Sequence, residues 1–394
     1  MRVCYATDGS VYRELPLAVA RPKDVADLRT LLAFARRHRV PLIPRAAGTS
    51  LAGQVVGAGI VVDIGFHMNR ILEIDAANRR VRVEPGVVRD ELNQALRPHG
   101  LMFAPETSTS NRAMIGGMVG NNSCGANSLR FGSTRDHLLE AKVLLTDGSE
   151  TMLRALVPEE FAAKCAVPGL EGDIHRWLAR RLGEAETAAG IVREFPKPTI
   201  RRRNTGYAVD LLLRQRPFVP QGAPFNLCTL LAGSEGTLAF ATEFTLNLVL
   251  LPPAERGVLV VHMKSVHEAT RANLIALRHA PDAVELIDRI LLDCASRNRD
   301  QARNRAFVEG DPGALLVIEW DRATRAEIDA QAAALEAELR AAGHGYSFPR
   351  LYGADIGRVW ALRKAGLGIL ANIPGDAKAV ACVEDTAVAV EDQP

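Results

Sequence analysis

Three segments of the sequence combine glycine with hydroxyl and amide side chains, the residue types that can bind a phosphate-containing ligand. The first reads Arg45-Ala46-Ala47-Gly48-Thr49-Ser50-Leu51 and continues to Gly53. Its small residues allow close approach to the backbone, its successive N–H groups can form an anion-binding nest, and its hydroxyls add donors. It has neither the G-x-G-x-x-G spacing nor the Gly-Lys-Ser/Thr ending of the common nucleotide motifs. We expect a diphosphate site of another kind, although a surface loop would have the same composition.

The second segment runs from Pro105 to Gly132 and is rich in Gly, Asn and Ser. Compact domains rarely contain so long an irregular connection unless it is functional, so we expect it to bind a ligand. Its backbone and amide groups suit a flat ring with alternating donors and acceptors. The third segment, Ala232–Leu238, lies between strands expected at Leu227–Ala232 and Ala239–Leu248. Structural turns would use the same glycines.

The elements that position these segments suggest two domains, as the length of 394 residues also does. We place the boundary at Pro252-Pro253, which gives domains of residues 1–250 and 251–394. Beyond the boundary, strands and helices alternate, with one helix expected at Ile356–Ile369 and a strand at Ala379–Val383. This alternation predicts an α+β sheet covered by helices on one face.

Composition excludes several classes of protein. The chain is 47% hydrophobic and 24% charged with a net charge of +2, which is typical of a globular enzyme and gives no basic surface for nucleic acid. Six cysteines without C-x-x-C spacing argue against zinc ribbons and local iron–sulfur ligation. No signal peptide or transmembrane run is visible, so we expect a cytoplasmic protein.

The three segments, in this order and together with Asn204-Thr205-Gly206-Tyr207, resemble the FAD-binding domain of the p-cresol methylhydroxylase (PCMH) and vanillyl-alcohol oxidase superfamily. The resemblance covers nearly the whole chain and is strongest to the D-2-hydroxy-acid branch. That branch includes D-lactate and D-2-hydroxyglutarate dehydrogenases, the FAD subunit of glycolate oxidase, and proteins that fuse a flavin half to an iron–sulfur half. The fold that it implies is α+β: a PCMH-type FAD-binding domain of two α+β subdomains, followed by an incomplete α+β cap domain.

The resemblance also implies the residues that hold the cofactor. Because the segments contain no His for a covalent link, we expect the FAD to be non-covalent. The expected FAD-binding residues are Arg45, Ala46, Ala47, Gly48, Thr49, Ser50, Leu51, Pro105, Thr107, Gly116, Gly117, Asn121, Ser123, Gly125, Glu235, Gly236 and Thr237.

The helix at Ile356–Ile369 contains Trp360-Ala361-Leu362-Arg363-Lys364, similar to the family segment whose Arg pairs with the substrate carboxylate. The guanidinium fork matches two carboxylate oxygens, so Arg363 is the expected substrate anchor, and an exposed helix charge is the alternative. One turn on, Leu367 stands where the glutarate enzymes have Thr, which argues against glutarate itself. Lys378 and the pair Glu384-Asp385 lie near a further polar contact of the family, although an exposed strand end explains them equally well. Glu285 and Asp288 match a cap-domain segment but are better explained as an acidic pair at a helix N-terminus.

By this resemblance the protein is an FAD-dependent dehydrogenase of a D-2-hydroxy acid of the lactate, glycolate or 2-hydroxyglutarate type. An iron–sulfur domain or a quinone would accept the electrons, and the alternative to a purely cytoplasmic protein is one that is peripheral to the inner membrane face. The divalent metal, its histidine ligands and the iron–sulfur motifs of relatives have no counterpart after His344, so we expect no metal site here and interpret the sequence as a fragment that binds FAD but turns over slowly or not at all. The alternatives are a non-catalytic FAD-binding subunit that needs a partner chain, and an alcohol or sugar oxidase on the same scaffold.

Overall fold

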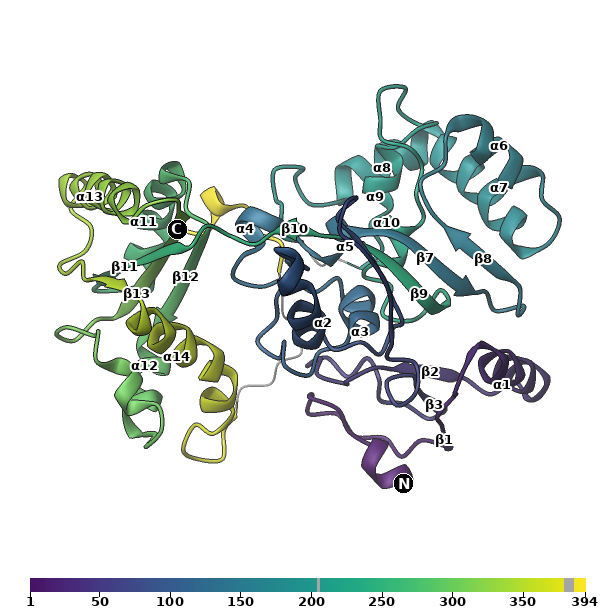
Figure 1. Ribbon diagram of the computed structural model, residues 1–394, viewed down its shortest axis with the longest axis horizontal. Coiled ribbons are helices and arrows are strands. Elements are labelled where there is room, and N and C mark those ends of the chain that lie inside the picture. The colour runs from purple at the N-terminus through teal and green to yellow at the C-terminus, as the bar shows by residue number, and fades with distance from the viewer. Residues whose placement is uncertain (204–205, 379–385) are drawn as a thin grey trace.

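The computed structural model describes residues 1–203, 206–378 and 386–394 (Figure 1). The strand expected at Ala379–Val383 and the pair Glu384-Asp385 therefore lie outside the described residues. The same holds for Asn204 and Thr205 of the Asn-Thr-Gly-Tyr segment.

The first sheet places the start of the first glycine-rich segment. Strands β1 (Ala18–Ala20) and β2 (Leu42–Arg45) lie parallel to β3 (Ile60–Asp63), one on each side of it. Helix α1 (Val25–His38) buries Leu28 and Leu32 in the same apolar cluster as β3. The β2–β3 ladder ends at the pair Arg45 and Asp63. The chain therefore leaves the sheet at Arg45, where the glycine-rich segment begins.

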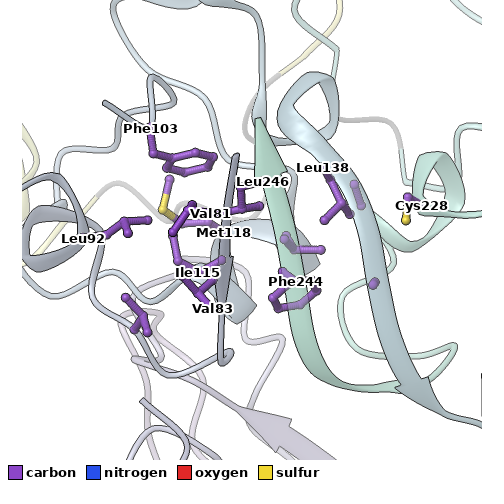
Figure 2. Packing of buried hydrophobic residues seen from close by; sticks show 14 of the residues in the cluster. Val81, Val83, Leu92, Phe103, Ile115, Met118, Leu138, Cys228, Phe244 and Leu246 are labelled. Atoms are coloured by element: carbon purple, nitrogen blue, oxygen red, sulfur yellow. The ribbon is translucent and has the colours of Figure 1, made fainter. Parts of the chain in front are cut away.

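A larger antiparallel sheet has the strand order β4-β5-β9-β7-β8. The buried side chains of helix α3 share one apolar cluster with residues of β5 and β9, among them Val83 and Leu246 (Figure 2). Helix α3 lies inside the segment that we expected to be irregular, and the spacing of Ile115, Met118 and Val119 is the helical signal that identifies it. The strands are β4 (Ile71–Asp75), β5 (Arg80–Val83), β7 (Leu138–Leu144), β8 (Glu150–Leu153) and β9 (Phe240–Asn247), and the helices beside them are α2 (Arg89–Leu96) and α3 (Ile115–Asn121).

The strand expected at Leu227–Ala232 is wrong, because this stretch forms helix α10 (Cys228–Leu231). A short apolar run has no periodicity that separates a buried strand from a buried helix. Here Asn226 starts the turn: its Oδ1 accepts a hydrogen bond of 2.9 Å from the backbone N–H of Cys228. The third glycine-rich segment consequently joins a helix to β9.

The C-terminal sheet has the strand order β12-β13-β11-β14, and all its neighbouring strands are antiparallel. Helices cover both of its faces, so the expectation of helices on one face is wrong (Figure 1). Helices α11 and α13 pack on one face and α12 and α14 on the other, which is why β11 and β13 are buried at successive residues. The elements are β11 (Glu255–Met263), α11 (Val266–Ala276), β12 (Ala283–Asp288), α12 (Arg289–Arg297), β13 (Ala314–Arg322), α13 (Arg325–Ala341), β14 (Arg350–Tyr352) and α14 (Ala354–Ala371).

The remaining strands and α-helices are short or peripheral. They are β6 (Leu101–Met102), which pairs with β10 (Val249–Leu250), and α4 (Ser128–Phe131), α5 (Thr134–His137), α6 (Pro158–Ala166), α7 (Leu170–Gly183), α8 (Ala185–Glu194) and α9 (Val209–Leu213). Within the described ranges no helix has both the length and the apolar character that a membrane crossing needs.

Candidate functional site

The three glycine-rich segments meet at one cleft, although they lie far apart in the sequence. The cleft contains about 970 Å³ of empty space, open solvent included. The expected residues that line it are Arg45, Ala46, Ala47, Gly48, Thr49, Ser50, Thr107, Gly116, Gly117, Ser123, Glu235 and Gly236.

The segments contact one another directly at glycines. A Cβ at Gly117 would lie 3.2 Å from Cβ of Ala46, and one at Gly236 would lie 3.1 Å from Cγ of Pro44. Gly236 also has φ +73°, a conformation that side chains rarely adopt. The backbone N–H of Glu235 donates to the carbonyl oxygen of Gly120 over 2.9 Å, which fixes the third segment to the end of α3. A larger side chain at either glycine would therefore separate the walls of the cleft.

The first segment presents unpaired backbone donors to the cleft. Within the described part of the chain, the N–H groups of residues 46–50 donate to no protein acceptor. The side chain of Arg45 lies against the N-terminal segment: its Nη1 donates to the carbonyl oxygen of Thr7 over 2.8 Å, and its guanidinium lies 5.3 Å from the ring centroid of Tyr5. The backbone nest rather than the arginine fork is thus the free anion-binding group of this segment.

Glu235 and Gln54 form a polar wall of the same cleft. Asn121 Nδ2 donates to Glu235 Oε1 over 3.3 Å, and burial raises the pKa of the Glu235 carboxyl. Gln54 Oε1 is buried and accepts no hydrogen bond from any residue that the structure describes, so it is an acceptor available to a ligand. Gln54 was not among the expected residues, although its place directly after Gly53 is a signal that could have identified it.

Five of the expected cofactor residues do not line the cleft itself. Asn121 supports it through Glu235, and Ser123 Oγ donates to Asn121 Oδ1 over 3.0 Å. Thr237 donates to the carbonyl oxygen of Ser234 over 2.6 Å and lines an adjoining hollow. Leu51, Pro105 and Gly125 are the other three. The apolar lining residues outside the expected set include Val55, Met114, Leu231, Phe240 and Phe244.

The expected substrate anchor lies on α14 and is already paired. Arg363 Nε donates to Glu285 Oε2 over 2.7 Å, with the arginine side chain 42% exposed and the glutamate side chain 13% exposed. Glu285 belongs to β12, so its interpretation as part of a helix N-terminus is wrong. Asp288 does cap α12, because its Oδ1 accepts from the N–H of Leu291 over 2.9 Å. Lys378 is exposed and its ammonium donates to the carbonyl oxygen of Ile373 beyond α14.

A second cleft, with about 1280 Å³ of empty space, open solvent included, lies between the Pro105–Gly132 segment and the C-terminal sheet. Lys364 Nζ lies 3.3 Å from Glu106 Oε1 across it. On the sheet side, Trp360 Nε1 donates to Glu319 Oε2 over 2.6 Å. Burial raises the pKa of Glu319 to about 7. This cleft therefore has an acid that can exchange a proton near neutral pH.

The histidines closest in spacing, His262 and His267, do not form a ligand pair. His262 is fully buried in β11, where its Nε2 accepts from the N–H of Glu309 over 3.0 Å, whereas His267 is exposed on α11. Within residues 1–203, 206–378 and 386–394, no group of three His, Cys, Asp or Glu side chains is arranged to hold a metal ion.

Comparisons with known proteins agree with this architecture. Residues 16–153 match the FAD binding domain family, and residues 252–394 match the C-terminal domain of FAD linked oxidases. The order of these domains defines a flavin-binding oxidoreductase scaffold. The chain belongs to the p-cresol methylhydroxylase and vanillyl-alcohol oxidase superfamily of FAD-binding proteins.

Among its relatives, D-2-hydroxyglutarate dehydrogenase of Pseudomonas putida is 36% identical over 403 residues, 99% of this chain and 39% of that protein. The enzyme of the same name from Escherichia coli is 35% identical over 99% of this chain and 39% of its own length. Glycolate oxidase subunit GlcD of Escherichia coli is 29% identical over 74% of this chain and 46% of its own length. The chain thus spans about two fifths of the D-2-hydroxyglutarate dehydrogenases that it matches.

Among solved structures, alkyldihydroxyacetonephosphate synthase has the same fold, with a TM-score of 0.57 and 16% identity over 90% of this chain and 58% of that one. The cleft between the three segments fits the FAD that the family binds. Its unpaired N–H groups suit a diphosphate, and the buried Oε1 of Gln54 is an acceptor for a donor of the ligand.

Proposed function

We propose that the chain is the FAD-binding portion of a dehydrogenase that oxidises a D-2-hydroxy acid of the lactate, glycolate or 2-hydroxyglutarate type. FAD, when bound, supplies the acceptor at N5 for the hydride that leaves the substrate Cα. The chain's own residues bind the cofactor, hold the substrate carboxylate and exclude water from the reacting atoms. Relatives that carry the names of such enzymes and align along 99% of the chain support this proposal.

The observation that carries the proposal is the meeting of three separate glycine-rich segments at one cleft. The nest at residues 46–50 would hold the diphosphate. The second and third segments, through Thr107, Gly116, Gly117, Ser123, Glu235 and Gly236, would line the rest of the cofactor. Asn121 and Thr237 would hold these residues in place through their hydrogen bonds to Glu235 and Ser234.

Arg363 is the proposed anchor of the substrate carboxylate. In this structure Nε already donates to the carboxylate of Glu285, whereas neither Nη1 nor Nη2 donates a hydrogen bond to any described residue. Nη1 and Nη2 therefore remain available to donate to the substrate carboxylate while Nε stays bonded to Glu285. Lys378, exposed beyond α14, would add a weaker polar contact.

The remaining parts of the proposal concern the whole protein. Residues 1–250 would form the FAD-binding domain and residues 251–394 the cap domain, since β10 still pairs with β6 whereas β11 already belongs to the C-terminal sheet. An iron–sulfur domain or a quinone would reoxidise the flavin. Cys4, Cys165, Cys228 and Cys294 are free thiols, which suits a reducing compartment such as the cytoplasm.

The experiment is anaerobic reduction of the bound flavin. The protein is loaded with FAD, and D- and L-2-hydroxy acids are added separately while the visible absorption of the flavin is recorded. Bleaching by a D acid and not by its L enantiomer supports the proposal. Bleaching by simple alcohols or sugars, with no response to 2-hydroxy acids, would favour an oxidase of those substrates on the same scaffold.

A further inference from the structure

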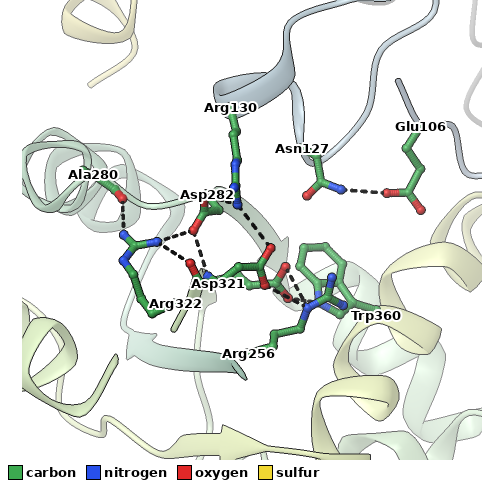
Figure 3. A network of polar contacts seen from close by, with 10 residues as sticks. Glu106, Asn127, Arg130, Arg256, Ala280, Asp282, Asp321, Arg322 and Trp360 are labelled. Carbon is green, nitrogen blue, oxygen red and sulfur yellow. Dashed lines mark hydrogen bonds and ion pairs between the residues drawn. The ribbon is translucent and has the colours of Figure 1, made fainter. Parts of the chain in front are cut away.

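Arg130 extends from the second glycine-rich segment into the C-terminal sheet. It lies on α4, near the end of that segment, and its Nη1 is 2.9 Å from Asp282 Oδ1 and 3.5 Å from Asp321 Oδ2 (Figure 3). The two carboxylate side chains are only 11% and 7% exposed, whereas the arginine side chain is 31% exposed. Arg130 therefore crosses the interface between the second glycine-rich segment and the C-terminal sheet, and its guanidinium binds to a buried acidic site on the sheet.

The acidic site is built by the C-terminal sheet itself. Arg322 Nη1 donates to Asp282 Oδ2 over 2.6 Å, and the backbone N–H of Asp321 donates to the same oxygen over 2.8 Å. Arg256 lies opposite Asp321 in the β11–β13 register, and its Nε donates to Asp321 Oδ1 over 3.1 Å. Each carboxylate is also paired with an arginine of its own sheet, and Arg130 of α4 is the one cation that contacts both carboxylates among the described residues.

A second ion pair crosses the interface in the opposite direction, at the other end of the segment. Here the cation, Lys364, belongs to α14 and the carboxylate, Glu106, belongs to the glycine-rich segment, with 3.3 Å between Nζ and Oε1. Glu106 and Asn127 are joined by a hydrogen bond of 3.2 Å, so the two ends of the segment are tied to each other as well. The segment is thus held to α14 near its first end and to the C-terminal sheet near its second end.

We propose that Arg130 is a positioning residue that couples FAD binding in the cleft to the order of the C-terminal sheet. The inference rests on the proposed FAD-binding function. Between Glu106 and Arg130 lie Thr107, Gly116, Gly117 and Ser123, which line the cleft, so a ligand that orders this segment also orders Arg130. The buried carboxylates that bind Arg130 transmit this order to β12 and β13, because removing one cation from a buried group of carboxylates is destabilising even where other arginines remain. Through the same sheet, Glu285 on β12 holds Arg363, so the coupling sets the substrate anchor relative to the flavin.

The test is hydrogen–deuterium exchange of the full chain, with and without saturating FAD. In the natural sequence FAD slows amide exchange in residues 115–121, which border the cleft, and also in β12 and β13. The slowing in β12 and β13 is expected at about 5- to 150-fold, the usual range of coupling between two sites. In Arg130→Ala, FAD still slows exchange in residues 115–121, but the effect on β12 and β13 falls below about 2-fold.

Three further variants distinguish coupling from a role in folding alone. Arg130→Lys retains the charge and restores part of the coupling, whereas a role in folding alone would alter exchange equally with and without FAD. Arg112→Ala is the matched control, because Arg112 is an exposed arginine of the same segment whose Nη1 donates to its neighbour Asn111 over 3.1 Å. If Arg130→Ala does not fold, Asp282→Asn tests the same ion pair from the other side.

Two results would overturn the inference. One is undiminished FAD-dependent protection of β12 and β13 in Arg130→Ala. The other is FAD protection of residues 115–121 in the natural sequence without any effect on β12 and β13. Absence of FAD protection at residues 115–121 in the natural sequence would instead contradict the proposed function, and the coupling with it.

Discussion

Arg363 of α14 and Glu285 of β12 form an ion pair of 2.7 Å between Nε and Oε2, which ties the helix that carries the proposed substrate anchor to the C-terminal sheet. The pair is monodentate, and the arginine side chain remains 42% exposed. A pair of this exposure contributes little to stability, about 0–1 kcal/mol. Its value lies in orientation, since it fixes one edge of the guanidinium and leaves the other to an incoming carboxylate.

Arg363→Ala should weaken binding of a small carboxylate by about 10- to 100-fold, because hydrogen bonds to charged groups contribute about 1.5–3 kcal/mol. Titration of the FAD-loaded protein with a 2-hydroxy acid, followed by the change in flavin absorption, measures the affinity. Arg358→Ala is the control: Arg358 is on the same helix and pairs with Asp355 over 3.2 Å. Equal affinities in Arg363→Ala and in the natural sequence would rule out the anchor.

Gly117→Val should abolish FAD binding or weaken it by at least about 10-fold without unfolding the protein. A Cβ at this position would lie only 3.2 Å from Cβ of Ala46. The two further methyl groups of valine would therefore displace the first segment from α3. FAD affinity is measured by fluorescence titration and folding by far-ultraviolet circular dichroism. Gly190→Ala, on α8 with no atom within 4 Å of the added Cβ, should bind FAD normally. Normal FAD affinity in Gly117→Val would show that the cleft is not the cofactor site.

Glu319 should make stability depend on pH. Burial, together with the nearby charges of Asp321 and Asp282, raises its pKa from 4.5 to about 7, although Arg256 of β11 and Trp360 of α14 lower it. The folded state thus holds this proton more tightly than the unfolded state, so the stabilisation is fully present below pH 4.5 and is lost as the pH rises through about 7.

Glu319→Gln should remove this dependence, and its effect on the free energy of unfolding should differ between pH 5 and pH 8 by about 2–3 kcal/mol. Urea unfolding of both proteins at the two pH values measures the difference, and Glu327→Gln, at an exposed position of α13, is the control. A constant difference between natural sequence and variant across this range would contradict the assignment.

Arg135 should stabilise the third glycine-rich segment. Its Nε and Nη2 donate to the carbonyl oxygens of Thr229 and Ala232 over 2.9 and 2.6 Å, at the end of α10. Burial lowers its pKa to about 10, so it stays charged at neutral pH. Arg135→Met should lower the free energy of unfolding by about 2–3 kcal/mol and weaken FAD binding, whereas Arg112→Met should change neither. Urea unfolding measures the first effect and FAD titration the second. An unchanged FAD affinity in Arg135→Met would show that Arg135 does not support the FAD-binding cleft.

Much of the fold and the cleft follows from local sequence. The glycines of the three segments mark positions without side chains, and at Gly117 and Gly236 the neighbouring segment lies too close for a larger side chain. The strand predicted at Leu227–Ala232 is wrong because six residues of this kind fit a buried strand and a buried helix equally well, and the turn made by Asn226 decides between them. The one-face prediction failed for the C-terminal sheet because neighbouring residues of β11 and β13 are both apolar, a pattern of strands covered on two faces.

The interface contacts could not have been predicted from the sequence. Arg130 and Asp282 are separated by 152 residues, and neither lies in a motif that specifies a partner. The same is true of Glu285 and Arg363, which only the packing of α14 against the sheet brings together. Pairing of charges across a sheet depends on tertiary register, whereas glycine-rich turns and helix periodicity depend on neighbours in the chain.

The most direct test of the central claim is equilibrium binding of FAD to the purified chain, with and without the Gly117→Val substitution. The claim that the three segments form one cofactor site predicts saturable binding of about one FAD per chain, as expected for a single buried pocket, and its loss in the variant. Failure of the natural chain to bind FAD while it is folded, or equal binding by the variant, would contradict it.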